Sequence, residues 1–391
     1  MDSTLMVNKV LNLDKTSWKL TKVGDLAKDI SKRVDNPGES EYDRFVSLRN
    51  FVVGDIKIKT WEPTENLASS AKAFKAGDIL FARRNAYLRR ASLVDFDGCC
   101  SGDAFVLREN HDKIVPGFLA FLMNSNALWD YANSNAAGTM SKRVKWRDLA
   151  EYEFLLPPKD QQVQLAKLLW AMDEVIEKEK EIHNKQQVIK EVLKKKYFYN
   201  PDIKSVKLGD VAKLTAGGTP STVKNEYWDN GTIPWLSSGE VHKKVVHDTE
   251  KCITDIGLKN SSAKMMEIHT CLIALAGQGK TKGTVAITEI PLCTNQSVAS
   301  IIANKDKVEP YYLYHNLDSR YLDFRHITGK GNSRTGLNLK ILNGFEITLH
   351  SIEERKKIVT ELNQIDSAMS TCEAKAESSK FLQKSLINQV F

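Results

Sequence analysis

Residues 160–198 read DQQVQLAKLLWAMDEVIEKEKEIHNKQQVIKEVLKKKYF, and residues 352–391 read IEERKKIVTELNQIDSAMSTCEAKAESSKFLQKSLINQVF. Neither stretch contains glycine or proline, and both are rich in the Glu, Lys, Gln and Leu residues that favour helix. Pro157-Pro158 before the first stretch and Asn200-Pro201 after it are typical helix stops. The two stretches therefore predict two long helices.

The apolar residues of both stretches are spaced so that the helices can pair lengthwise. In the second stretch they alternate in steps of four and three, which is a heptad seam, at Ile358, Leu362, Ile365, Met369, Cys372 and Ala376. The first stretch begins alike at Leu165, Leu169, Met172 and Ile176, and its seam then shifts to Ile182, Ile189 and Val192. We expect an antiparallel coiled coil; the alternative is two surface helices packed on separate domains.

The chain also repeats itself once, with a period of about half its length. Residues 22–27 (KVGDLA) return as residues 207–212 (KLGDVA), 185 positions later, and residues 153–156 (EFLL) match residues 346–349 (EITL), 193 positions later. Asp173 and Asp366 keep the spacing of 193, as do Phe198 and Phe391. Several matches in the same order, with a slowly growing offset, indicate an old duplication with small loop insertions.

Each repeat places a glycine-rich region before its long helix. Short alternating runs between turns, such as residues 76–82 (AGDILFA) and 283–288 (GTVAIT), predict strands, and residues 116–132 and 310–326 predict helices. The fold class is therefore α+β, with two pseudo-repeated α/β domains separated by two long helices. The expected boundaries are a first domain with a short N-terminal tail, a first helix, a second domain and a second helix, at 1–158, 159–199, 200–351 and 352–391.

Composition sets wide limits on function. The chain has 391 residues, of which 42% are hydrophobic and 27% charged, and a net charge of +7, which permits a polyanionic partner without requiring one. The longest apolar runs, such as residues 271–276, fall far short of the ~20 residues that span a bilayer. The N-terminus has no basic start followed by an apolar core, so we expect no secretory signal and a cytoplasmic protein.

Motifs of metal binding and catalysis are missing from the sequence. The 6 cysteines are scattered without a CxxC pair, so we expect no zinc or other metal site. Gly279-Lys280-Thr281 has the ending of a phosphate-binding loop, but that motif needs glycine at position 274, which is Ala274. The sequence also has no HExxH, no GxSxG and no strand–GxGxxG–helix pattern. We therefore expect a non-catalytic protein.

Basic loops occur at matched places in the two repeats. Residues 83–90 (RRNAYLRR) hold four arginines with Asn and Tyr between them, and their counterpart is residues 277–282 (GQGKTK). A second basic loop is found at residues 141–145 (SKRVK) and again at 330–334 (KGNSR). Arginine can fork two hydrogen bonds onto guanine or phosphate, and Asn can do so onto adenine. These loops predict DNA contact; the alternative is a solvated charged face.

With these features together, the chain resembles the specificity subunit of type I restriction-modification systems. Residues 214–221 (LTAGGTPS), 227–228 (YW) and 233–238 (IPWLSS) are similar to the opening of the family's target-recognition domains, and residues 45–50 (FVSLRN) stand in the matching place of the first repeat. Residues 156–162 (LPPKDQQ) are similar to the family's Pro-Pro-x-x-Glu-Gln boundary, with Asp in place of Glu. The second copy, residues 349–355 (LHSIEER), has lost both prolines.

The resemblance implies a division of labour within a larger complex. Each target-recognition domain would read one half of a bipartite, asymmetric DNA site, and the paired helices would set the unread interval. At about 1.5 Å per residue the first helix would extend about 57 Å, against ~34 Å for a turn of B-DNA. Two methyltransferase subunits, and in some complexes two restriction subunits, would bring S-adenosylmethionine and ATP with Mg²⁺, so that this chain binds no cofactor itself.

The candidate DNA-binding residues come from the basic loops. In the first repeat they are Arg83, Arg84, Tyr87, Arg89 and Arg90, followed in rank by Lys142 and Arg143. In the second repeat they are Gln278, Lys280 and Lys282, followed by Lys330 and Arg334. The competing interpretations are a specificity component of a related methyltransferase or phage-defence system, a self-sufficient enzyme acting on nucleic acid, and a coiled-coil adaptor that binds only protein.

Overall fold

The computed structural model describes residues 13–30, 32–277, 279–327 and 337–391. The chain forms two compact units. Unit 1 comprises Met1–Glu181 and Cys372–Phe391, and unit 2 comprises Ile182–Thr371. Each unit therefore contains one mixed α/β domain together with one part of each long helix.

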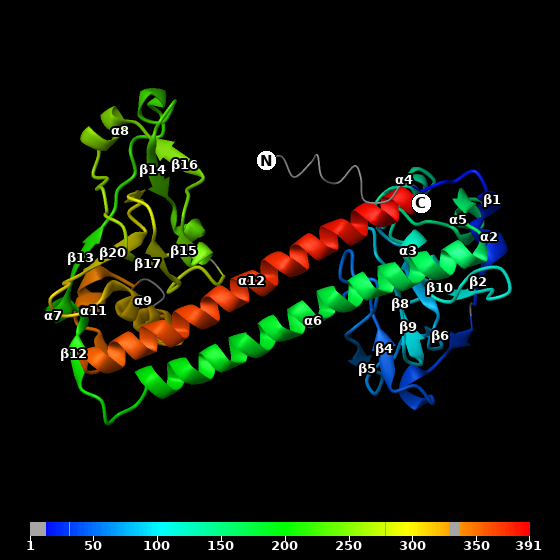
Figure 1. The fold of residues 1–391 in the computed structure, drawn as a ribbon, viewed down its shortest axis with the longest axis horizontal. Coiled ribbons are helices and arrows are strands. Elements are labelled where there is room, and N and C mark those ends of the chain that lie inside the picture. The colour runs from blue at the N-terminus through cyan, green and yellow to red at the C-terminus, as the bar shows by residue number, and fades with distance from the viewer. Residues whose placement is uncertain (1–12, 31, 278, 328–336) are drawn as a thin grey trace. The chain divides into compact units, whose positions relative to one another are not determined.

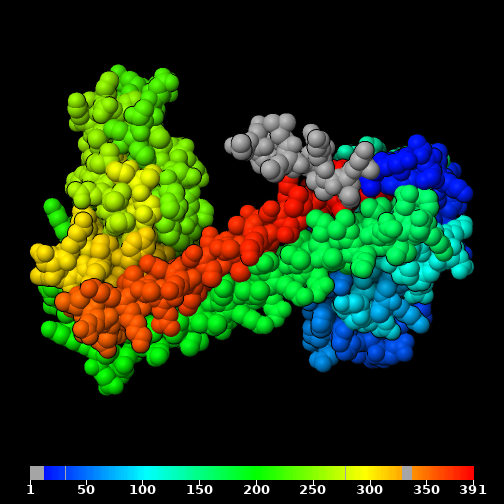
Figure 2. Space-filling view, in the orientation of Figure 1, coloured from blue at the N-terminus to red at the C-terminus, as the bar shows by residue number. Residues whose placement is uncertain are grey.

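The two long helices are α6 (Lys159–Phe198) and α12 (Ile352–Val390), drawn in green and red in Figure 1. In unit 1, Gln383 Nε2 donates to the carbonyl of Leu169 at 3.2 Å, and Lys375 lies 3.9 Å from Glu179. In unit 2, Lys190 pairs with Asp366 and Tyr197 with Glu361. In these contacts the residue numbers rise along α6 as they fall along α12, so the two helices are antiparallel. Figure 2 shows their side chains in contact.

Unit 1 is built on three sheets joined by short helices. Strands β1 and β11 form an antiparallel pair, β2-β10-β7-β8 form an antiparallel sheet, and the order of the third sheet is β3-β6-β9-β4-β5. The elements are β1 (Lys19–Lys22), α2 (Val23–Leu26), β2 (Ala27–Asp29), β3 (Arg33–Val34), η2 (Pro37–Glu39), β4 (Arg44–Val46), β5 (Glu62–Pro63), β6 (Ala71–Phe74), β7 (Ile79–Ala82), η3 (Ala86–Leu88), β8 (Ala91–Leu93), β9 (Gly98–Cys100), β10 (Ala104–Glu109), α3 (Leu119–Leu122), α4 (Asn126–Ser134), α5 (Trp146–Ala150) and β11 (Glu153–Leu156).

Unit 2 repeats this plan. Strands β12 and β21 pair, the main sheet has the order β13-β20-β17-β18-β15, and a small sheet has the order β16-β14-β19. The elements are β12 (Ser205–Lys207), α7 (Leu208–Val211), β13 (Ala212–Ala216), η4 (Asn225–Tyr227), β14 (Ile233–Leu236), η5 (Ser238–Lys243), β15 (Val245–Val246), β16 (Lys251–Ile253), α8 (Asp255–Lys259), β17 (Cys271–Ala274), β18 (Val285–Thr288), β19 (Cys293–Thr294), β20 (Val298–Ala303), α9 (Pro310–Ser319), α10 (Tyr321–His326), α11 (Leu339–Asn343) and β21 (Glu346–Thr348).

The duplication predicted from the sequence is visible strand by strand. The pair β1·β11 corresponds to β12·β21, and the order β2-β10-β7-β8 corresponds to β13-β20-β17-β18. The parallel pair β4·β9 corresponds to the parallel pair β14·β19. The corresponding strands β7 and β17 are buried at all four of their residues. The two repeats therefore have the same fold.

The helix predicted over residues 116–132 and the one predicted over 310–326 are each interrupted. In the first repeat α4 begins anew after α3, because the side chain of Ser125 caps it by accepting a hydrogen bond from the amide of Leu128. In the second repeat the break between α9 and α10 falls at Arg320. Residue spacing did not reveal these breaks, since an N-cap inside an apolar run leaves the pattern of apolar positions unchanged.

The long helices form part of each domain's core. In unit 1, Leu165 and Leu169 of α6 and Leu386 and Val390 of α12 belong to the cluster around Phe121 and Trp129. In unit 2, Phe198 of α6 and Ile358 and Leu362 of α12 belong to the cluster around Tyr312 and Phe324. Of the other predicted seam residues, Ile176 is buried, and Met172, Ile365 and Met369 are half-buried.

The predicted shift of the α6 seam is wrong. Ile182, Ile189 and Val192 are exposed, with 44%, 52% and 59% of their surface accessible. The buried positions on this part of α6 are instead Lys190, Lys194 and Phe198. Apolar spacing misled here because the contact face of the helix carries lysines whose charges are paired inside unit 2.

Substitutions on the two faces distinguish these seams. Leu362→Ala should lower the free energy of unfolding by about 2–5 kcal/mol, because Leu362 is fully buried and alanine leaves a cavity. Ile189→Ala should change it by no more than ~0.5 kcal/mol, because half of that side chain is already in water. Urea titrations monitored by circular dichroism measure both. Equal losses of unfolding free energy in the two variants would show that Ile189 packs in the seam after all.

Candidate nucleic-acid interface

The two basic loops predicted in the first repeat are joined by their backbones. The amide of Asn85 donates to the carbonyl of Lys142, and the amide of Val144 donates to the carbonyl of Arg83, both at 2.9 Å. We call residues 83–90 and 141–145 together the joined loops. The sequence predicted each loop separately, and the structure brings them into one basic surface.

Asp103 lies at the centre of the joined loops. Its carboxylate accepts a hydrogen bond from Nε of Arg143 at 2.9 Å and lies 3.4 Å from a terminal nitrogen of Arg84. Partial burial by itself would raise the pKa of Asp103, but the hydrogen bond from Arg143 and the charges of both arginines lower it below the ordinary value. Asp103 therefore remains ionised and holds the two arginines beside each other.

The other three arginines of the loop contact the protein with part of their guanidinium groups. Arg89 donates to Asn126 at 3.0 Å and to Asp130 at 2.6 Å, and Arg90 donates to the carbonyl of Leu48 at 2.8 Å. The guanidinium of Arg83 lies 5.3 Å from the centre of the Phe105 ring. These contacts hold the loop in place, so the four arginines of this loop are not equivalent as DNA ligands.

A strained turn carries Tyr87 outward. Asn85 and Arg89 both adopt the left-handed backbone region, with φ of 54° and 49°, on either side of the short helix η3. Residues other than glycine rarely adopt this backbone region, and such strain often marks functional sites. Tyr87 between them is 68% exposed. An exposed aromatic ring beside arginines suits contact with a nucleic acid.

The corresponding loop of the second repeat is held by α10. Arg325 donates to the carbonyl of Gly279 at 2.7 Å, and the hydroxyl of Tyr321 donates to the carbonyl of Lys280 at 3.0 Å. Gly277 has a φ of 142°, which side-chain-bearing residues rarely adopt, and a Cβ there would lie 2.7 Å from Thr281. Lys280 and Lys282 lie on this loop, whereas Gln278, Lys330 and Arg334 lie outside the described residues.

Sequence reasoning missed Asp103 and Asp130, the carboxylates that position the arginines. Asp103 follows Ser101-Gly102 in a turn before β10, and it is 40 residues from Arg143 in sequence. Turn aspartates are common, so only the fold identifies this one. Among the described residues, no group of His, Cys, Asp and Glu could hold a metal ion. No helix in the described ranges is long and apolar enough to cross a membrane.

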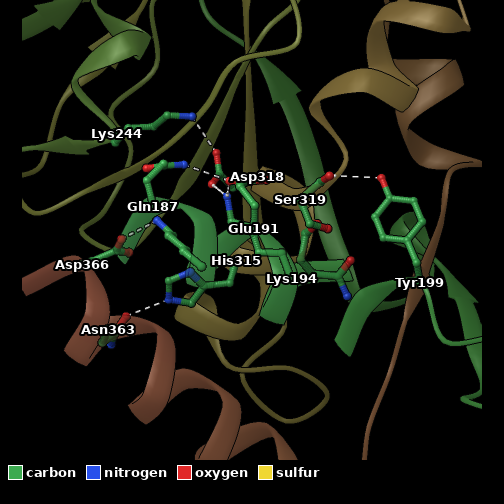
Figure 3. A network of polar contacts seen from close by, with 12 residues as sticks. Gln187, Glu191, Lys194, Tyr199, Lys244, His315, Asp318, Ser319, Asn363 and Asp366 are labelled. Atoms are coloured by element: carbon green, nitrogen blue, oxygen red, sulfur yellow. Dashed lines mark hydrogen bonds and ion pairs between the residues drawn. The ribbon is translucent and has the colours of Figure 1, made fainter. Parts of the chain in front are cut away.

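A buried polar network joins α6 to the domain of unit 2 (Figure 3). Asp318 of α9 accepts from Lys194 of α6 at 2.5 Å and from Lys244, in the turn after η5, at 2.6 Å. Burial alone would raise the pKa of Asp318, but the charges of Lys194 and Lys244 outweigh it and hold the pKa well below the ordinary value. The carboxylate therefore links the long helix to a segment that leads into β15.

His315 lies in the same network with its ring fully buried. Nε2 of His315 lies 2.7 Å from the side-chain oxygen of Asn363 on α12. Burial lowers the pKa of His315 to about 4, so the imidazole is neutral at pH 7 and donates this hydrogen bond. Protonation would give the His315 imidazole a positive charge in a site buried away from water.

This burial predicts an acid-sensitive unit 2. His315 takes up a proton near pH 6.5 when the chain is unfolded but only near pH 4 when it is folded, so the free energy of unfolding falls as the pH drops through that window. The loss reaches about 3 kcal/mol, at ~1.4 kcal/mol per unit of pKa. His315→Gln keeps a donor to Asn363 and removes the titration. Urea titrations at about pH 7.5 and about pH 5 measure the difference.

His350, whose pKa burial also lowers, contributes equally to both proteins, so the comparison isolates His315. If the His315→Gln variant were as acid-sensitive as the parent chain, His315 would not be the cause of the acid sensitivity.

The comparisons with known proteins agree with this fold. A family model described as the type I restriction modification DNA specificity domain matches residues 16–188 and 200–378, once in each repeat. The chain belongs to this family of DNA specificity proteins.

Individual relatives carry the same description. The chain is 30% identical over 172 residues to the EcoR124I/EcoR124II type I restriction enzyme specificity subunit of Escherichia coli, covering 44% of this chain and 42% of that one. It is 31% identical over 188 residues to the MjaIX specificity subunit of Methanocaldococcus jannaschii, covering 47% and 41%. These matches span less than half of each relative's length.

A solved structure confirms the fold over the whole chain. The S subunit of a type I restriction-modification system from M. genitalium superposes with a TM-score of 0.67 at 15% identity, covering 97% of this chain and 98% of that one. At this identity the likeness concerns the fold alone.

Proposed function

We propose that this chain is the DNA-recognition subunit of a type I restriction-modification complex and that it reads a bipartite, asymmetric site. The observation that carries the proposal is the duplication of a domain that presents basic loops at the same place in both copies. The copies differ in loop chemistry, with the arginines of residues 83–90 in one and the glycines and lysines of residues 277–282 in the other. Two related domains with different loops suit two different half-sites.

The chemistry in this proposal belongs to partner subunits. The chain would carry no catalytic residues and bind no cofactor; two methyltransferase subunits would bring S-adenosylmethionine, and two restriction subunits, where present, ATP and Mg²⁺. Such a complex would act on DNA in the cytoplasm. The relatives' description as specificity subunits supports this division.

The proposal is tested by the DNA preference of the full chain bound to its methyltransferase partner. Selection from a pool of random duplexes should return a motif of two short, unlike half-sites separated by an unread interval of fixed length. A matching pool with one half-site scrambled should bind at least roughly a thousandfold more weakly, within the span usual between specific and non-specific binding. Binding without any sequence preference would favour a protein-only adaptor.

An exposed apolar face on α6 supports docking of the methyltransferase subunits on the long helices. Within unit 2, Ile182, Val188, Ile189 and Val192 all expose more than two fifths of their surface, although each is a residue that usually packs against protein. In the unit 1 part of the same helix, Leu168 and Val175 are exposed to 41% and 47%. A helix that leaves such residues in water offers a surface to a partner helix.

Introducing charge on this face should block docking. Ile189→Glu with Val192→Glu should reduce co-purification of the methyltransferase subunit at least about tenfold, since a desolvated carboxylate costs more than the ~1.4 kcal/mol that a factor of ten represents. Asn184→Glu adds one carboxylate, against two in the double variant, at an exposed polar position of α6 and serves as the control. Undiminished co-purification of the double variant, with helix content retained, would place the docking surface elsewhere.

A further inference from the structure

The structure separates the arginines of the joined loops by what their guanidinium groups already hold. Both terminal nitrogens of Arg89 are engaged, one by Asn126 and one by Asp130. A terminal nitrogen of Arg90 is used on a carbonyl, and Arg83 stacks on Phe105. A guanidinium whose terminal nitrogens are occupied cannot fork two hydrogen bonds onto a base edge.

Arg143 is held differently. Its Nε donates a hydrogen bond to Asp103 at 2.9 Å. Neither terminal nitrogen of Arg143 has a hydrogen-bond partner among the residues that the structure describes. Its side chain is 40% exposed. Both hydrogen-bonding positions of the fork are therefore open to a ligand, while the carboxylate fixes the plane of the group from behind.

The backbone at Arg143 is fixed as well. Its amide donates to the carbonyl of Ala137 at 2.9 Å, and its carbonyl accepts from the amide of Ala137 at 3.0 Å. Val144, the next residue, is completely buried. A side chain fixed at both its backbone and its Nε loses little freedom when it binds, which is the condition for reading a base edge rather than following a phosphate.

The chemistry of an open fork identifies its partner base. Two parallel N–H donors match the O6 and N7 acceptors of guanine in the major groove, which is the commonest specific contact between a protein and DNA. Adenine and cytosine each present a donor amino group on that edge, so they do not match.

Among the residues that the structure describes, the second repeat has no carboxylate at the position of Asp103. The amide of Arg83 donates to the carbonyl of Asp103 at 2.9 Å, and at the same place in unit 2 the amide of Leu275 donates to the carbonyl of Ser297 at 2.8 Å. Ser297 therefore occupies the position of Asp103 without its charge. A charged residue at this position in one repeat and an uncharged residue in the other suit two half-sites that are read differently.

We propose that Arg143 reads a guanine in the half-site bound by the first domain and that Asp103 is its positioning residue. The sequence ranked Arg143 below the arginines of residues 83–90. The contacts raise it above Arg84, Arg89 and Arg90, each of which uses a terminal nitrogen on an acceptor of the protein. This assignment rests on the proposed function, since it requires a DNA half-site for the first domain.

The test compares variants of the full chain, in complex with its methyltransferase partner, on a pool randomised at every position of the motif. Arg143→Lys keeps the charge but cannot fork, so it should lose roughly 5- to 150-fold of discrimination at one G·C pair of one half-site. The salt dependence of binding should remain unchanged, because the charge remains. Asp103→Ser, which installs the residue of the second repeat, should lower discrimination at the same pair to a smaller extent.

The matched control is the Arg33–Asp35 pair on and beside β3, in which Nε of the arginine also meets a carboxylate, at 2.6 Å. Arg33→Lys and Asp35→Ser should leave the motif unchanged. An unaltered motif with Arg143→Lys, a uniform loss across all sequences, or a first half-site without guanine would each overturn the assignment. If the parent complex itself selects no motif, the proposed function fails instead.

Discussion

The whole structure depends on a constraint of the long helices, which cannot bury their apolar residues alone. Leu169 and Leu362 are fully buried only because α6 and α12 lie side by side and each is covered by a domain. Helices of this composition are held by tertiary packing rather than by propensity, so the domains and the helices stabilise each other. The basic loops are presented by sheets that rest on this packing.

The pairing is specified by polar residues at related positions. Asp173 lies beside Gln383 in unit 1, and Asp366 pairs with Lys190 in unit 2. The offset of 193 relates Asp173 to Asp366 and Lys190 to Gln383, so the same contact occurs twice with one partner changed. Burial raises the pKa of Asp173, which has an amide for a partner where Asp366 has an ammonium group. Buried polar contacts of this kind favour one register of a coiled coil over its alternatives.

Much of the fold was predictable because it follows from local signals. Long runs without glycine or proline indicated the helices, and the repeated segments indicated two related domains. The second half of the α6 seam was not predictable, because Lys190 and Lys194 are buried and paired with carboxylates on other elements. The spacing of apolar residues gives no sign of a buried ion pair. The basic loops were located, but the ranking of their arginines depended on Asp103 and Asp130, which approach from distant parts of the chain.

Phe198, which ends α6, and Phe391, which directly follows α12, show how each repeat contributes to the core of the other domain. Phe391, from the second repeat, packs on Phe118 and Phe154 of unit 1, and Phe198, from the first repeat, packs on Tyr312 of unit 2. Each repeat thus completes the interior of the other. Recombination that exchanges a domain between related genes preserves the protein only if the incoming domain can pack against the phenylalanine of the other repeat. New target preferences must therefore arise without loss of these aromatic contacts.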